Sequence, residues 1–68
     1  MKLGRTQRQL LEILRVSPCP LSDVDLARRT RDLLPLTRQS LGLLLRRGLV
    51  SRRVEGERAD SRFVYFLT

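Results

Sequence analysis

Two short segments, "LSDVDL" at residues 21–26 and "LTRQSL" at residues 36–41, share one pattern: a leucine, a serine or threonine, three mostly polar residues and a second leucine. A hydroxyl in this place accepts a hydrogen bond from a backbone amide of a first helical turn, and the flanking leucines pack together as a hydrophobic staple. Asp25 completes a capping box with Ser22. The pattern predicts two helix starts, capped by Ser22 and Thr37.

Two helices are expected before the second cap. The first covers residues 6–16, where leucines recur at helical spacing and Thr6 with Gln9 fits a capping box. The second covers residues 22–31. Pro35 marks the break that follows, because the residue before a proline avoids helical backbone angles.

The third helix is expected over residues 37–47, ending at Gly48, the usual left-handed position after a last turn. After Gly48 the pattern changes period. The segments "LVSRRVE" and "RFVYFLT" are rich in β-branched and aromatic residues, and the polar "GERADS" separates them. They predict a β-hairpin over residues 49–67. The expected fold class is mainly α with a small β-hairpin, in a single domain over residues 1–68.

The third helix has two distinct faces. With successive residues placed about 100° apart, Leu41, Leu44 and Leu45 form a buried stripe. The opposite face and its flanks carry mostly polar residues: Arg38, Gln39, Ser40, Gly42, Leu43, Arg46 and Arg47.

The charge of the chain narrows the choice of partner. The formal net charge is +7, and every basic residue except Lys2 is an arginine. Such a balance points to a polyanion. Arginine suits bidentate contact with phosphate or guanine, although an arginine bias also arises from a GC-rich genome, and the two explanations carry similar weight.

The chain lacks the residues that catalysis and metal binding usually require. The 68 residues include no histidine and one cysteine, Cys19. Neither a metal-binding cluster nor a histidine-based triad can be assembled, and Cys19 has no partner for a disulfide within the chain, which fits a reducing compartment. We expect a protein that is not an enzyme and that binds no metal or cofactor.

The segment "LTRQSLGLLLRRGLVSRR" resembles the recognition helix and first wing strand of bacterial winged-helix DNA-binding regulators. The order helix, short extended piece, helix, helix, hairpin is that of a winged helix-turn-helix domain, and the resemblance covers residues 6–67. It implies that the helix over residues 37–47 enters the major groove and that residues 52–62 form a wing on the backbone or in the minor groove.

The chain departs from that family in two places. The segment "TRDLLPL" replaces the usual glycine-containing turn between the second and third helices, so the second helix ends either near Thr30 or near Leu34. The third helix is about one turn shorter than usual, because Gly48 closely follows Leu45.

The resemblance and the charge together predict sequence-specific binding of double-stranded DNA by a small transcriptional regulator. Gln pairs with adenine, Arg pairs with guanine, and Leu can touch a thymine methyl group. Arg58, near the hairpin tip, is expected to reach a narrow minor groove. The expected DNA-binding residues are Thr37, Arg38, Gln39, Ser40, Gly42, Leu43, Arg46, Arg47, Arg52, Arg53, Arg58 and Arg62.

Simpler explanations stand beside these assignments on the third helix. Arg46 and Arg47 equally fit a role in complementing the helix dipole. Gly42 is explained somewhat more readily by a close crossing of another helix than by an approaching DNA backbone. Leu43 beside Gly42 also fits a surface that seats a protein partner.

The hairpin has alternatives of its own. Arg52 and Arg62 also fit ion pairs with the glutamates across the hairpin, which would keep a sheet edge soluble. The side chains of Phe63, Tyr65 and Leu67 are expected to alternate toward the helices, as core residues rather than as platforms for stacked bases.

Other functions share this fold, so fold alone does not settle function. Winged helices also serve as protein-interaction modules in transcription, replication or chromatin assemblies, and the net charge of +7 favours DNA over that alternative. An excision or replication accessory factor of a mobile element would bind DNA in the same way. A homodimer is compatible with the sequence.

We expect neither binding of an effector nor association with a membrane. Arsenic-repressor-like winged helices use Cys and His ligands that this chain lacks, and regulators of the multiple-antibiotic-resistance type carry extra dimerisation helices for which 68 residues leave no room. The longest apolar run, "FVYFL", is too short to span a bilayer, and "MKLGRTQRQ" lacks a signal-peptide core. We expect a cytoplasmic or nucleoid-associated protein.

Overall fold

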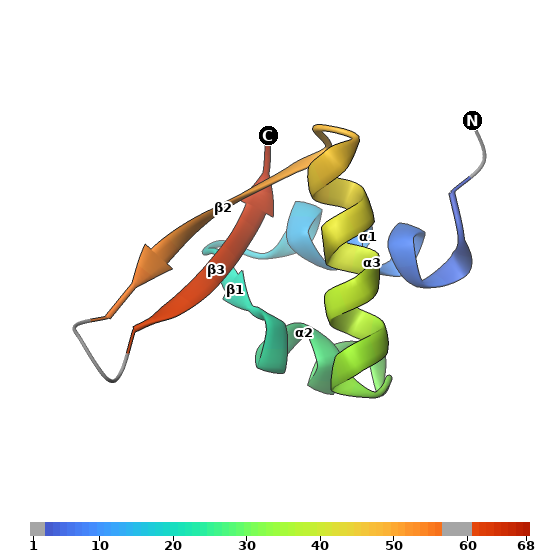
Figure 1. Ribbon diagram of the computed structural model, residues 1–68, viewed down its shortest axis with the longest axis horizontal. Helices are drawn as coiled ribbons and strands as arrows, with labels where there is room; N and C mark the ends of the chain where they lie inside the picture. Colours follow the sequence, from blue (N-terminus) through green and yellow to red (C-terminus); the bar gives the residue numbers. More distant parts are fainter. Residues whose placement is uncertain (1–2, 57–60) are drawn as a thin grey trace.

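The computed structural model describes residues 3–56 and 61–68. Within these ranges three helices and three strands follow one another, and the hairpin of the last two strands projects away from the helices (Figure 1). The elements are α1 (Arg5–Val16), β1 (Leu21–Ser22), α2 (Asp23–Thr30), α3 (Leu34–Arg46), β2 (Val50–Glu55) and β3 (Arg62–Leu67). The predicted fold class, mainly α with a small β-hairpin, is confirmed.

The sheet is antiparallel and has β3 at its centre, in the order β1-β3-β2. Strand β2 pairs with β3 from Val50 opposite Leu67 to Glu55 opposite Arg62. The short strand β1 places Leu21 opposite Tyr65. The extended piece expected between the first two helices is strand β1, the additional strand of the sheet. Because β1 leads directly into α2 and pairs with β3, it joins the helices to the hairpin.

The core lies where the three helices meet the inner half of the sheet. Most of its side chains are leucines, and each helix contributes at least one of them. The buried cluster consists of Leu10, Leu14, Leu21, Leu26, Leu41, Leu44, Val50 and Tyr65.

The predicted alternation of β3 toward the helices is only partly correct. Tyr65 is buried, but Phe63 is 43% exposed and Leu67 is 36% exposed. Phe63 pairs with Val54 of β2 only, whereas Tyr65 also pairs with Leu21 of β1 and belongs to the buried cluster. Val64, on the opposite face of β3 from Tyr65, is also buried, and its register partner in β1 is Ser22.

The first of the two repeated segments is a helix start, as predicted. The Oγ atom of Ser22 accepts a hydrogen bond from the amide of Asp25 at 3.2 Å, and Ser22 is the N-cap of α2. Leu21 and Leu26, the expected staple, both belong to the buried cluster.

The second segment is not a helix start, and the predicted Thr37 cap is wrong. Helix α3 begins at Leu34, with Leu33 at the N-cap and Pro35 in the first turn. Proline is tolerated there because the amides of a first turn have no helical partner in any case. Thr37 is fully buried inside the helix, whereas its expected staple residue Leu36 is 44% exposed.

The first helix also starts differently from the prediction. Its N-cap is Gly4, which forms no side-chain hydrogen bond, and the helix begins at Arg5. The Oγ1 atom of Thr6 donates a hydrogen bond to the carboxylate of Asp32 at 3.4 Å. Thr6 therefore links α1 to the α2–α3 connection instead of forming a capping box with Gln9.

The open question about the end of the second helix is resolved at Thr30. Arg31 adopts the left-handed conformation with φ of 60°, a position that usually favours glycine. Helix α3 then has 13 residues, so the shortening inferred from the sequence came from placing its start too late. Its end is as predicted: Gly48 has φ of 73°, and the amide of Leu49 donates to the carbonyl of Leu44 at 3.1 Å.

The two hydroxyl residues of the repeated pattern should respond oppositely to mutation. The Oγ1 atom of Thr37 has no hydrogen-bond partner among the described residues. Because an unpaired buried hydroxyl is destabilising, we expect Thr37→Val to raise the free energy of unfolding by up to about 1 kcal/mol. Ser22→Ala removes a cap and should lower it by about 1 kcal/mol. Urea denaturation measures both, and a loss of stability in Thr37→Val would contradict the unpaired hydroxyl.

Candidate nucleic-acid interface

The outer face of α3 forms a shallow hollow at the protein surface. Leu41 and Leu44 point into the core and fix the rotation of the helix. The hollow on the other side is lined by Arg38, Gln39, Gly42, Leu43 and Arg46. The structure therefore brings together five of the predicted site residues on one helix face.

Two predicted site residues do not reach that surface. Thr37 is 0% exposed and Ser40 is 5% exposed, because both lie on the stripe that also carries Leu41 and Leu44. Their prediction as DNA contacts is wrong in this structure. Leu45, predicted as buried, is only partly so and packs against the edge of the core.

Arg47 differs from its neighbour Arg46. A terminal nitrogen of Arg47 donates a hydrogen bond to the side-chain oxygen of Gln7 at 3.3 Å, which ties the end of α3 to α1. Arg46 is exposed and lines the outer hollow. Arg46 is therefore the better placed of the two to meet an external partner.

Gly42 is one of the residues that line the hollow, and the packing around it does not require a glycine. A Cβ atom built at this position meets no atom of another element within 4 Å. The explanation by close helix crossing is therefore wrong for this chain. The other explanation, close approach of a backbone from outside, stays a prediction.

Arg38 is held by an acidic residue of the neighbouring helix. Its Nε atom donates to the Oδ2 atom of Asp23 at 2.7 Å. Asp23 stands in the first turn of α2, where a carboxylate also complements the helix dipole. Its second oxygen accepts a hydrogen bond from the amide of Val24 at 2.8 Å.

A second hollow adjoins the first and leads toward the hairpin. Arg38 lines both, and in the second it is joined by Arg28 of α2 and by Arg62 at the start of β3. Neither Arg28 nor Asp23 is among the DNA-binding residues expected from the sequence. Neither role has a local signal, because both depend on how α2 packs against α3 and the hairpin.

Two successive arginines of β2, Arg52 and Arg53, lie on opposite faces of the hairpin, and each packs on an aromatic ring. The guanidinium carbon of Arg52 lies 4.2 Å from the ring centre of Phe63, and that of Arg53 lies 5.8 Å from the ring centre of Phe66. Such cation–π contacts stabilise a charged side chain in a defined place.

The cross-hairpin ion pairs considered from the sequence are not those observed. Arg62 stands opposite Glu55 in the register, but the ion pair of Glu55 in the described part of the hairpin is with Arg53, at 3.6 Å. Arg58, the predicted minor-groove residue, and Glu57 lie outside the described residues.

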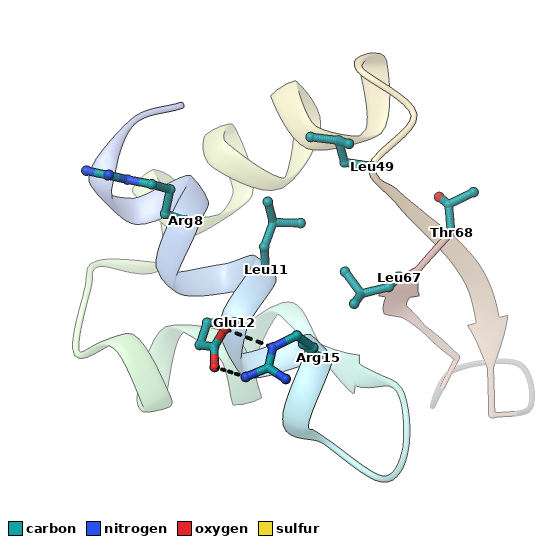
Figure 2. Close-up of a pocket in the computed structure, with 7 residues that line it drawn as sticks. All are labelled: Arg8, Leu11, Glu12, Arg15, Leu49, Leu67 and Thr68. Atoms are coloured by element: carbon teal, nitrogen blue, oxygen red, sulfur yellow. Dashed lines mark hydrogen bonds and ion pairs between the residues drawn. The ribbon is translucent and has the colours of Figure 1, made fainter. Parts of the chain in front are cut away.

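A different, apolar hollow lies between α1 and the end of the hairpin. Leu11, Leu49 and Leu67 converge there (Figure 2). At its rim Arg15 forms a hydrogen-bonded ion pair with Glu12, and this bond lowers the pKa of the Glu12 carboxyl. The chemistry of this hollow is unlike that of the basic, polar surface of α3.

Residues 3–56 and 61–68 contain no group of three or more His, Cys, Asp or Glu side chains placed to hold a metal ion. No helix in the same ranges is long and apolar enough to cross a membrane.

No family model and no curated protein matches the sequence. Solved structures that match the fold include two mutant forms of MepR from S. aureus, one of them from a multidrug-resistant clinical isolate. Their TM-scores are 0.87 and 0.86, at 24% sequence identity and over 97% of this chain. MepR structures have a winged-helix fold. This chain has the winged-helix fold.

Within the winged-helix fold, the hairpin of β2 and β3 is the wing and α3 is the helix beside it. The resemblance drawn from "LTRQSLGLLLRRGLVSRR" is confirmed at the level of the fold. The chain spans about half the length of the two MepR chains, 47% and 48%.

The open surroundings of Gly42 lead to a prediction about stability. Alanine is the better helix former, and nothing obstructs its methyl group at this site. We expect Gly42→Ala to raise the free energy of unfolding by about 0.5–1 kcal/mol. Thermal and urea denaturation test this, and a destabilised variant would show that the surroundings of Gly42 are more crowded than the structure indicates.

Proposed function

We propose that this protein binds double-stranded DNA as a small transcriptional regulator, with α3 in the major groove and the wing on the adjacent backbone or minor groove. The observation that carries the proposal is the outer face of α3. That face is basic and polar, and it presents a glycine that no packing within the described chain requires.

The residues of this face suit the edges of base pairs. The major groove admits an α-helix, and its base edges offer paired acceptors on guanine and a donor–acceptor pair on adenine. Arg38 and Arg46 match the first pattern and Gln39 matches the second. Leu43 suits a thymine methyl group, and Gly42 would let the helix backbone come close to the DNA.

The wing and α2 supply charges suited to phosphate. Arg52, Arg53 and Arg62 are exposed on the hairpin, and Arg28 is exposed on α2. Contacts with phosphate position a protein on the duplex without reading its sequence. Arg58 and Arg47 are kept as secondary candidates, since Arg58 lies outside the described residues and Arg47 is bonded to Gln7.

A binding role fits this chain better than catalysis, since the proposed surface consists of arginines, an amide, a glycine and a leucine.

Two copies on one site would place two α3 helices in successive turns of the major groove, about 34 Å apart. Selection of preferred sequences from a random duplex pool would then return palindromic half-sites at that spacing.

The electrostatic part of the proposal predicts a strong dependence on salt. For each phosphate that is neutralised, the logarithm of the association constant should fall by about 0.9 per unit of log salt concentration. Fluorescence anisotropy with a random duplex at several salt concentrations measures the slope. Arg8→Ala serves as a control, because Arg8 is exposed and lines the apolar hollow beside α1 and neither of the two basic hollows. A slope near zero would contradict DNA binding.

The base-reading part predicts a separation of folding from recognition. We expect Gln39→Ala and Arg46→Ala to stay within about 0.5 kcal/mol of the parent in unfolding free energy, as exposed changes do. Each should lose discrimination at particular base pairs, by about 1–3 kcal/mol for a bidentate contact. Binding to a selected duplex and to its single-base variants measures the loss.

Leu44→Ala is the matched change on the buried side of α3. It should destabilise the fold by about 2–5 kcal/mol, and bind poorly only because it unfolds. If Gln39→Ala and Arg46→Ala bind DNA like the parent but lose a protein partner in a pull-down, α3 is a protein-docking surface and the proposal is wrong.

A further inference from the structure

We propose that Asp23 sets the base preference of Arg38, by holding its guanidinium so that the two terminal nitrogens meet a guanine in the major groove. The inference rests on the proposed function, in which α3 lies in that groove. Asp23 acts here as a positioning residue, because it works through Arg38 and need not touch a base itself.

The carboxylate of Asp23 is itself held in place. Its Oδ1 atom accepts a hydrogen bond from the amide of Val24 at 2.8 Å, and its Oδ2 atom accepts one from Arg38 Nε at 2.7 Å. The side chain of Asp23 is 21% exposed and that of Arg38 is 60% exposed. The Asp23 carboxylate is therefore fixed by the backbone of α2, whereas the guanidinium of Arg38 is largely exposed to solvent.

Asp23 bonds to the Nε atom of Arg38, so the two terminal nitrogens of the guanidinium stay available for another acceptor. Arginine has five N–H donors in a planar fork, and the bond to Asp23 occupies only the one on Nε. No described residue accepts a hydrogen bond from the terminal nitrogens of Arg38. A bidentate contact with guanine O6 and N7 can use this end of the fork, and a guanidinium that is already oriented loses less entropy on binding.

The surroundings of the pair separate base reading from phosphate binding. Arg38 lies where the hollow of α3 meets the hollow beside the wing. In the second hollow Arg28 and Arg62 are the other cations. The negative charge of Asp23 repels phosphate, so it disfavours a backbone contact by Arg38 and leaves that role to its neighbours.

A purely structural ion pair would behave differently. An exposed pair adds little to stability, and a tie between α2 and α3 would affect all duplexes alike. A positioning role instead predicts a loss of discrimination at one base pair, the same pair that Arg38 reads.

The test uses the full chain and a guanine-containing duplex selected from a random pool. Its dissociation constant is compared with those of duplexes in which single base pairs are exchanged. We expect Arg38→Ala to lose about 5-fold or more of the discrimination at one G·C pair. Asp23→Ala should lose discrimination at the same pair, Asp23→Asn should retain part of it through its amide oxygen, and the double variant should match Arg38→Ala.

Asp25→Ala is the control for charge, because Asp25 lies in the same first turn of α2 and has no bond to Arg38. Both alanine variants should bind a random duplex slightly more tightly, but Asp25→Ala should keep the base preference. Melting curves confirm that all variants are folded at the assay temperature.

The outcomes separate this inference from the proposed function. A parent that binds no duplex DNA overturns both. A parent that binds DNA without preferring guanine at any position overturns this inference and the guanine contacts proposed for Arg38 and Arg46, but not DNA binding. A guanine preference that survives in Asp23→Ala overturns this inference alone. An equal loss of preference in Asp25→Ala also overturns it, since any acidic residue of that turn would then suffice.

Discussion

The burial of one stripe of α3 determines most of what this molecule presents to a partner. Leu41 and Leu44 are fully buried against the other helices and the sheet, and Thr37 and Ser40 lie on the same side. Burial of one face fixes the orientation of the helix about its own axis. The residues on the opposite face are therefore directed toward solvent. In a small domain few other contacts compete with the burial of these leucines.

Sequence reasoning succeeded where local chemistry decides the structure. Ser22 caps α2 because a hydroxyl there meets a free amide, and Gly48 ends α3 because it accepts a positive φ. It failed where the same residue types serve two purposes. Proline both breaks helices and starts them, so the sequence alone does not show that Pro35 lies in the first turn of α3. Thr37 has the residue type of a cap, but it is buried inside the helix.

In the candidate site, too, some features follow from the local sequence and others depend on how the helices pack. The outward residues of α3 follow from helical periodicity, so Gln39 and Arg46 could be placed from the sequence. The bond between Asp23 and Arg38 joins two helices and depends on how α2 crosses α3. The exposed Phe63 depends on where the helices stop covering the hairpin. Contacts of this kind have no periodic signature, and only the folded arrangement brings them together.

The central claim is that α3 and the wing, and not the apolar hollow beside α1, form the binding surface. An NMR titration of the isotope-labelled protein with duplex DNA tests it most directly, because backbone amide shifts report which face is contacted. If α3 and the wing contact the duplex, the largest changes lie between Arg38 and Arg46, with further changes at Arg52 and Arg53. Changes centred on Leu11 and the other residues of the apolar hollow, with those of α3 unmoved, would contradict it.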